Sequence, residues 1–411
     1  MNLLDRIDPA IAGVLSRALE GEEISWQDGL RLCETNGREL QATITAADEL
    51  RRRQVGDIVT YVVNRNVNFT NVCVKHCGFC AFSRTYRSEQ GYLLPTDEIL
   101  RRIGEAASMG ATEVCIQAGL PPDMDGGFYI DLTAAVKKTF PNIHIHAFSP
   151  EEILYGATLS GASIYDYLRA LKTAGLGSLP GTSAEILDQA IRDVISPGRI
   201  TVEQWVNVIT TAHGLGIPTT STIMYGHLET PEHWVKHMNL LRDIQHDTRG
   251  FTEFVPLSMI YQEAPMYHNR LGPSLRPGPS GNEVIKMHSV ARLMLGASLR
   301  NIQSSWVKEG PKLAQYLLSV GANDVGGTLM NESISTSAGA QYGQLVTPRE
   351  LRRLIRDAGR TPAQRKTNYD LIKIYSAQDD EVTDLDYVND ADARFGSYQR
   401  LAASDEFRFR Q

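Results

Sequence analysis

The chain has 411 residues, of which 42% are apolar and 22% are charged, and these proportions are ordinary for a large globular protein. Its formal net charge of −7 argues against a nucleic-acid partner, which would require a basic face. No run of the sequence approaches the roughly 18 uncharged apolar residues that a membrane span needs, so no membrane association is expected.

Residues 1–55 are expected to form an N-terminal helical segment. Ser25 followed by Asp28 is typical of a helix cap, Asn36-Gly37 interrupts the pattern, and helical spacing resumes after it. The start of the chain mixes acids and arginines with its apolar residues, which is unlike a secretory leader. We therefore expect a protein of the reducing cytoplasm.

From about residue 58, short strand-like segments alternate with amphipathic stretches. The expected strands are 59–72, 113–119, 143–149, 175–181, 218–226, 252–258, 301–307 and 323–328. Eight strand-then-helix units predict an α/β fold, a (β/α)8 TIM-type barrel over residues 56–362. A doubly wound sheet is the alternative, but no G-x-G-x-x-G opens any of its helices.

Residues 363–411 are expected to form a C-terminal acidic tail. From residue 376 onward the sequence is polar and acidic, and we expect it to be loosely ordered and without readable chemistry.

Cys73, Cys77 and Cys80 form a C-x₃-C-x₂-C triplet directly after the first expected strand. Three thiolates so close together can bind one soft metal centre, and three ligands would leave one iron of a 4Fe-4S cube open. A zinc site that also uses His76 is the main alternative, although such sites usually draw on two separated pairs of ligands. A disulfide framework is disfavoured, because five cysteines are sparse in a chain of this length.

Phe79, directly before the third cysteine, completes a pattern that resembles the signature of the radical S-adenosylmethionine (SAM) superfamily. The resemblance implies a 4Fe-4S cluster held by Cys73, Cys77 and Cys80, whose open iron chelates the methionine part of SAM. It also implies that Phe79 lies against the adenine.

Further SAM contacts are expected at the C-terminal ends of the strands, where barrel enzymes bind their ligands. The turn Gln117-Ala118-Gly119 ends the second strand, and a glycine there lets a ligand approach the backbone. Residues 222–229 resemble the G-x-I-x-G-x-x-E segment of the superfamily, with departures at Thr222 and Met224. The resemblance implies these contacts to SAM: Phe79, Gln117, Ala118, Gly119, Ser183, Glu185 and Gly226.

The substrate side is less well marked. His144 and His146 share one face of the third strand, and His146 would lie near the substrate if that face lines the lumen. The densest polar set follows the seventh and eighth strands, and from it we expect Asp324 and Glu332, with His146, to be catalytic. Cys33 and Cys115 are expected to be core residues without a function.

A second resemblance covers about residues 55–370. The segments NVNFTNVCVKHCGFCAFSR, HIHAFSPEEI, IPTTSTIMYGHLETPEHW and SSWVKEGPKLAQ are similar to one radical SAM branch, FO synthase subunit 2. FO is the deazaflavin 7,8-didemethyl-8-hydroxy-5-deazariboflavin. The branch members are 5-amino-6-(D-ribitylamino)uracil–L-tyrosine 4-hydroxyphenyl transferases. The resemblance implies that the enzyme cleaves the L-tyrosine side chain and adds the 4-hydroxybenzyl group to the diaminouracil.

The same resemblance implies an electron donor and functional pairing with an FO synthase subunit 1-type enzyme. Another reaction of the branch is the first alternative: the subunit 1 cyclisation, or the aminofutalosine and dehypoxanthine futalosine steps of menaquinone biosynthesis. A non-catalytic metal-binding barrel is the more distant one.

Overall fold

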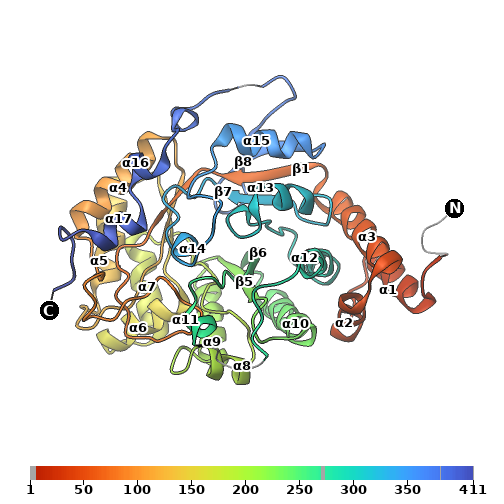
Figure 1. Cartoon of the computed structure of the whole chain (residues 1–411), viewed down its shortest axis with the longest axis horizontal. Helices are drawn as coiled ribbons and strands as arrows, with labels where there is room; N and C mark the ends of the chain where they lie inside the picture. Colours follow the sequence, from red (N-terminus) through yellow and green to blue (C-terminus); the bar gives the residue numbers. More distant parts are fainter. Residues whose placement is uncertain (1–5, 270–273, 380, 411) are drawn as a thin grey trace.

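A closed ring of mainly parallel strands, surrounded by helices, forms the centre of the molecule (Figure 1). This computed structural model describes residues 6–269, 274–379 and 381–410. Its strands are β1 (Ile58–Val62), β2 (Asn64–Val67), β3 (Glu113–Ile116), β4 (His144–Ala147), β5 (Thr219–Tyr225), β6 (Phe251–Ser258), β7 (Asp324–Gly327), β8 (Thr361–Arg365) and β9 (Leu371–Ile374).

The first expected strand is divided into β1 and β2, because the chain changes partners at Val63. β1 pairs with β7, whereas β2 pairs with β3, and β3 pairs with β4 in turn. β5 pairs with β6. Every pairing along this ring is parallel, as a (β/α)8 barrel requires.

Single bridges complete the ring where two strands were expected. The segment 175–181 contributes the bridges His146↔Ser178 and Leu179↔Thr219. The segment 301–307 contributes Phe254↔Ile302 and Gln303↔Asp324. Both segments occupy the expected positions in the ring but pair too briefly to count as strands, and the predicted (β/α)8 barrel is confirmed.

The strand β8 was not expected. It runs parallel to β1 from the Ile58↔Thr361 pair onward, and β9 then pairs antiparallel with β8. The sequence TPAQR does not alternate apolar with polar residues and contains few apolar residues, so it does not predict a strand. The boundary expected after residue 362 falls inside this strand.

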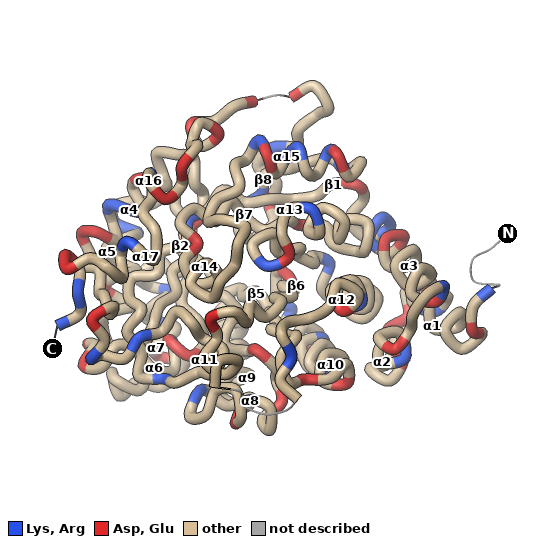
Figure 2. Tube along the Cα trace, in the orientation of Figure 1, with Lys and Arg blue, Asp and Glu red and all other residues tan. Residues whose placement is uncertain are grey.

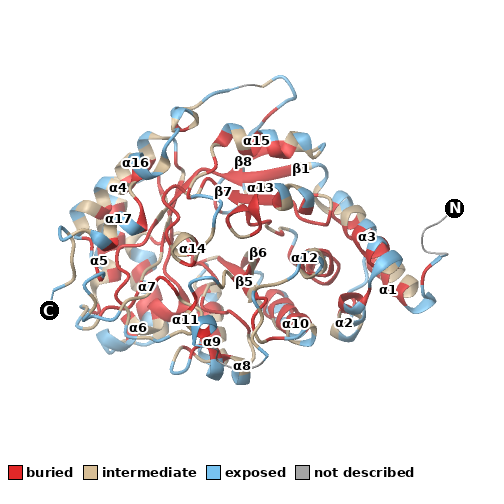
Figure 3. Cartoon of the chain, viewed as in Figure 1, coloured by how far each residue is buried: buried red, intermediate tan, exposed pale blue. Residues whose placement is uncertain are grey.

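Helices cover the outside of the ring (Figure 1). They are α4 (Thr96–Ser108), α5 (Phe128–Thr139), α6 (Pro150–Ser160), α7 (Ile164–Ala174), α8 (Gln189–Ile195), α9 (Val202–Gly214), α10 (Pro231–Thr248), α12 (Gly281–Leu295), α13 (Trp306–Leu317) and α15 (Pro348–Asp357). Two single-turn helices, α11 (Pro265–His268) and α14 (Ile334–Ser337), lie instead among the loops that follow the strands (Figure 1). Figure 3 shows that the buried faces of the outer helices turn toward the ring and their exposed faces outward. Basic and acidic residues alternate over these outer faces (Figure 2). No helix in the described part of the chain is long and apolar enough to cross a membrane.

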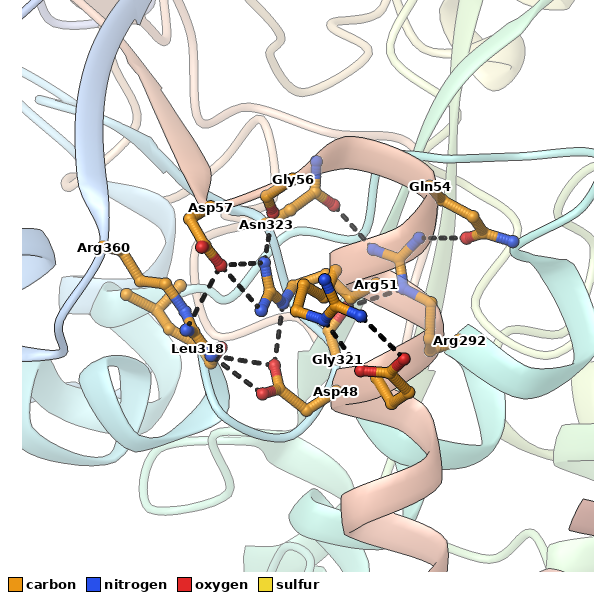
Figure 4. Close-up of polar contacts among 12 residues, drawn as sticks. Asp48, Arg51, Gln54, Gly56, Asp57, Arg292, Leu318, Gly321, Asn323 and Arg360 are labelled. Atoms are coloured by element: carbon orange, nitrogen blue, oxygen red, sulfur yellow. Dashed lines mark hydrogen bonds and ion pairs between the residues drawn. The ribbon is translucent and has the colours of Figure 1, made fainter. Parts of the chain in front are cut away.

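Three N-terminal helices, α1 (Pro9–Leu19), α2 (Trp26–Glu34) and α3 (Gly37–Val55), pack against α10 and α12. Figure 4 shows the polar junction at the end of α3, where the Arg51 guanidinium donates a hydrogen bond to the Asp48 carboxylate at 2.7 Å. Arg292 of α12 donates to the Gln54 side chain of α3 at 3.1 Å, to the Gly321 carbonyl at 2.8 Å and to Asn323 at 2.7 Å. The junction therefore ties the helical segment to the turn that leads into β7.

The expectation of a loosely ordered C-terminal tail is wrong. Residues 384–410 form η2 (Asp384–Tyr387), α16 (Ala391–Phe395) and α17 (Tyr398–Ala403), and they lie beside α4 and α5 (Figure 1). Leu385, Phe395 and Tyr398 are buried in this otherwise polar sequence. Burial of these three side chains stabilises the packing of the segment against the barrel. The average composition of the segment, which is polar, does not reveal them.

Candidate active site

A cavity of about 230 Å³ opens at the C-terminal ends of the barrel strands. Nine of the sequence-predicted residues line it together: Cys73, Phe79, Cys77, Cys80, Gln117, Ala118, Gly119, Ser183 and Glu185. They come from the loops that follow β2, β3 and the bridge segment at Ser178. The barrel thus brings together residues that lie more than one hundred positions apart in the chain.

The loop that carries the three cysteines is held by its backbone. The Cys73 amide donates to the Arg84 carbonyl at 2.9 Å, and the Gly78 amide donates to the Ile195 carbonyl at 2.7 Å. All three thiols are free and partly exposed to the cavity. Burial raises the pKa of Cys73, and it raises the pKa of Cys77 to about 12. A metal that binds here must therefore displace the thiol protons.

These thiols fit a cluster better than a single ion. A single zinc requires every ligand within about 2.3 Å of one point, whereas a 4Fe-4S cube binds each cysteine at a different iron. His76 is exposed and does not line the cavity. The arrangement argues against the zinc alternative.

Arg199, in the loop before α9, is a cavity residue that sequence reasoning missed. Its guanidinium donates to Glu185 at 2.5 Å and to the Ser183 hydroxyl at 2.9 Å, and it lies 5.5 Å from the centre of the Phe79 ring. Burial opposes its charge, yet Cys77 and Glu185 together hold the pKa of Arg199 above its ordinary value. A lone arginine in a loop gives no sequence signal, because arginines are common on surfaces.

Glu152 completes a helix cap with Ser149, accepting from the Ser149 amide at 2.7 Å. Its second oxygen also accepts from the Ala118 amide at 3.0 Å. It lines the cavity, and burial raises its pKa to about 7. Glu152 therefore fixes the turn formed by residues 117–119.

Gly119 is needed for packing as well as for access. A Cβ atom at this position would overlap the carbonyl oxygen of Val72, the residue directly before Cys73. The turn after β3 and the cysteine loop therefore touch backbone to backbone.

Gly226, expected to contact SAM, does not line the cavity. Its amide donates to the Glu229 carboxylate at 2.6 Å, and the His227 amide donates to the same group at 2.9 Å. Glu229 is buried and also accepts from Trp234 at 3.0 Å. Glu229 thus holds the loop after β5 in place through the Gly226 and His227 amides.

The three residues expected to be catalytic also lie outside the cavity lining. The His146 ring lies 2.7 Å from the Ser178 hydroxyl, and burial lowers its pKa to about 4. Asp324 accepts from Thr60 at 2.5 Å and from Arg365 at 2.6 Å.

Glu332 accepts from the Ser335 amide at 2.9 Å, at the start of α14. Glu332 itself does not reach the cavity, but Lys308, which follows the seventh expected strand, lines its wall. Asp324 lies outside the cavity because it is the first residue of β7, at the end of the barrel away from the cavity.

Two family patterns match the chain. That of the radical SAM superfamily matches residues 67–241, and that of the CofH/MqnC C-terminal region matches residues 248–378. Among solved structures, methylornithine synthase (PylB) superposes with a TM-score of 0.66 at 20% identity, covering 85% of this chain and 97% of that one. The hydrogenase maturase HydG superposes with a TM-score of 0.68 at 15% identity, covering 89% of this chain and 78% of that one. These two likenesses concern the fold.

Curated relatives are much more similar in sequence. The 5-amino-6-(D-ribitylamino)uracil–L-tyrosine 4-hydroxyphenyl transferase of Methanothermobacter thermautotrophicus is 49% identical over 87% of this chain and 96% of its own length. The protein of the same description from Archaeoglobus fulgidus is 51% identical over 80% and 93%. The FO synthase of Mycobacterium tuberculosis is 46% identical over 90% of this chain, which spans 43% of that longer protein.

Proposed function

Because the chain belongs to the radical SAM superfamily and, within it, to the family of the 5-amino-6-(D-ribitylamino)uracil–L-tyrosine 4-hydroxyphenyl transferases, we propose that it transfers the 4-hydroxybenzyl group of L-tyrosine to that diaminouracil. The reaction is a step in the biosynthesis of the deazaflavin FO. The observation that carries the proposal is the identity of 49% over 96% of the length of a transferase.

Members of the superfamily use a 4Fe-4S cluster and SAM, and the proposed ligands of the cluster are Cys73, Cys77 and Cys80. When bound there, the cluster would supply the electron for reductive cleavage of SAM, the source of the radical that acts on tyrosine. The half-buried thiols bind the cluster as thiolates, and the surrounding backbone hydrogen bonds hold their loop in place.

The wall formed by Phe79, Gln117–Gly119, Ser183, Glu185 and Arg199 is the proposed SAM site. SAM carries both cationic groups and a carboxylate, and the Glu185–Arg199 pair presents one charge of each sign to the cavity. Glu152 orients the 117–119 turn through the Ala118 amide at 3.0 Å, and the Asn68 side chain holds the same turn through the Gln117 carbonyl at 2.7 Å. Phe79 offers an aromatic face to the adenine.

The remaining wall suits an aromatic substrate. Leu257, Met259, Ile260 and Ile334 make it largely apolar. An apolar wall disfavours water beside a reactive carbon-centred radical. The 4-hydroxyphenyl ring of tyrosine is of the size and polarity that this wall accommodates.

We further propose an external electron donor and a subunit 1-type enzyme that receives the adduct and closes the ring. Relatives described as FO synthase are more than twice as long as the matched region, which leaves room for a second activity in the same polypeptide. We also propose that the enzyme works in a reducing compartment such as the cytoplasm, where an oxygen-sensitive cluster and free thiols would persist.

The test is a reconstituted, anaerobic enzyme incubated with SAM, a strong reductant, L-tyrosine and 5-amino-6-(D-ribitylamino)uracil. We expect 5′-deoxyadenosine and a 4-hydroxybenzyl adduct of the uracil by mass spectrometry, and no adduct when either substrate is omitted. Conversion of a preformed adduct to the tricyclic deazaflavin, without adduct synthesis, would assign the subunit 1 reaction instead. Consumption of dehypoxanthine futalosine would assign the menaquinone step.

A further inference from the structure

Lys308, in the first turn of α13, places an ammonium group on the part of the cavity wall formed by β6, α13 and α14. The side chain is partly buried, and its neighbours on this wall are mainly the apolar residues Leu257, Ile334 and Ala338. A desolvated ammonium group is unfavourable without a counter-charge, so its position requires an explanation.

The carboxylates that act on the charge of Lys308 already have other hydrogen-bond partners. Glu332, Glu309 and Glu185 are the carboxylates that act on its charge, and burial lowers the pKa of Lys308 in spite of them. Glu332 accepts from the Ser335 amide, Glu309 accepts from the Ser258 hydroxyl, and Glu185 pairs with Arg199.

Lys308 differs in this respect from the other basic residues of the cavity. Lys75 lies 3.3 Å from Glu151, and Arg199 pairs with Glu185 at 2.5 Å. In the described part of the chain, no hydrogen-bond or ion-pair partner of the Lys308 ammonium group is found. The cavity therefore holds one cation that is free to bind an anion of a ligand.

The chemistry of the ligands selects the anion. The carboxylate of SAM meets the Glu185–Arg199 pair in the proposed SAM site. At neutral pH the diaminouracil and its ribityl chain are uncharged, whereas free L-tyrosine carries a carboxylate beside its apolar ring. A lysine at the edge of an apolar wall matches this combination, because it offers a point charge to an anion while the ring packs beside it. Resting on the proposed function, we propose that Lys308 binds the carboxylate of L-tyrosine and so positions the amino acid for cleavage.

The experiment compares L-tyrosine with L-tyrosinamide, which replaces the carboxylate by a neutral amide of the same shape. Equilibrium binding of each compound is measured on the reconstituted, SAM-loaded enzyme and on its Lys308→Met and Lys308→Arg variants. We expect the wild-type enzyme to prefer L-tyrosine by about 10- to 100-fold, the range expected for a charged hydrogen bond.

In Lys308→Met the preference should fall to within about 2-fold while L-tyrosinamide binds as before, and Lys308→Arg should keep most of it. Lys312→Met is the matched control, because Lys312 is exposed on α13 beyond the break in the helix at Gly310, and it should behave as the wild type. Iron content and SAM binding of each variant establish that the site is intact. An unchanged preference in Lys308→Met overturns the role of Lys308, whereas a wild-type enzyme that binds no tyrosine at all overturns the proposed function itself.

Discussion

The three thiols of the cysteine loop differ from the two remaining cysteines in their surroundings. Cys33 is buried in the core and burial raises its pKa to about 12, while Cys115 accepts a hydrogen bond from the Gln117 side chain at 3.2 Å. Neither of these two lines the cavity.

Replacing any one of Cys73, Cys77 or Cys80 by alanine should therefore abolish cluster binding, because each is proposed to bind a separate iron. Anaerobic reconstitution of the wild type should give about four irons per chain, and each variant should give far less. Cys33→Ala and Cys115→Ala should keep the wild-type iron and sulfide content. Stoichiometric zinc without sulfide in anaerobically prepared protein would contradict the assignment.

Gly119→Val should impair the cluster as well as SAM binding. From the sequence alone, this substitution would be expected to obstruct SAM while the cluster still assembles. The overlap of a Cβ atom with the Val72 carbonyl implies that the cysteine loop must move too. Iron content after reconstitution distinguishes the two expectations, and a variant with full iron loading would show that the loop tolerates the side chain.

Glu309 makes the stability of the protein depend on pH. Burial raises its folded-state pKa to about 7, against an ordinary value near 4.5. The folded protein therefore holds a proton that the unfolded chain releases, so the free energy of unfolding should fall as the pH rises from about 4.5 to about 7. Glu309→Gln should reduce this fall by up to about 3 kcal/mol, measured by urea unfolding at pH 5 and pH 7.5. An undiminished fall in the variant would mean that Glu309 ionises normally.

At the scale of elements, the C-terminal segment fastens the loop that follows the cysteines. The Tyr398 ring lies 5.3 Å from the Phe82 ring, and its hydroxyl donates to the Phe82 carbonyl at 3.2 Å. The Leu93 amide donates to the Phe407 carbonyl at 2.9 Å, farther along the same loop. The segment and the loop thus form one packed unit.

Tyr398→Ala should lower the free energy of unfolding by about 3 to 5 kcal/mol, the usual cost of removing a large buried aromatic ring. It should also speed the loss of the cluster in the presence of an iron chelator, because Phe82 lies two residues after Cys80. Tyr387→Ala is a suitable control in the same segment, since Tyr387 is 72% exposed. Equal rates of cluster loss in both variants would show that packing of Tyr398 does not stabilise the loop that carries the cysteines.

Elements were predictable where a local pattern exists. Capping and spacing identify the N-terminal helices, and the Ser25 side chain accepts from the Asp28 amide as expected. The strand β8 and the bridge segments at residues 178 and 302 owe their pairing to neighbours that are distant in the sequence. Their pairing is a tertiary property, which local propensity does not record.

At the scale of the whole molecule, β8 completes a charged layer within the barrel, at the end away from the cavity. Its last residue, Arg365, donates to Asp324 at 2.6 Å and lies 3.6 Å from Glu253. Tyr369, from the turn before β9, donates to Glu253 at 2.6 Å. The layer joins β6, β7 and β8.

Arg365→Met should lower the free energy of unfolding by about 3 to 5 kcal/mol, because Asp324 then remains buried without its cation. Adding Asp324→Asn should restore part of this loss, since the uncompensated charge is removed. Urea unfolding of the two single variants and the double variant measures the coupling. Additive losses would show that the pair does not interact.

The candidate site was predictable where its residues are contiguous or follow a strand directly. The cysteine triplet with Phe79, and the 117–119 turn, are of this kind and lie together in the cavity. Lys308 belongs to the dense polar set that follows the seventh strand, but its spacing could not show which member of that set reaches the cavity. Arg199 lies in a loop, where its residue type gives no signal. Asp324 lies outside the cavity lining, and its place at the start rather than the end of β7 was not visible in the sequence.

The contact between Phe82 and Tyr398 joins residues 316 positions apart, and this has a consequence for biosynthesis. At a translation rate of about 5 to 20 residues per second, Tyr398 leaves the ribosome roughly 15 to 60 s after the cysteine loop. Until then the loop lacks the segment that packs against it. We therefore expect iron and sulfide to be delivered to the released polypeptide rather than to the nascent chain.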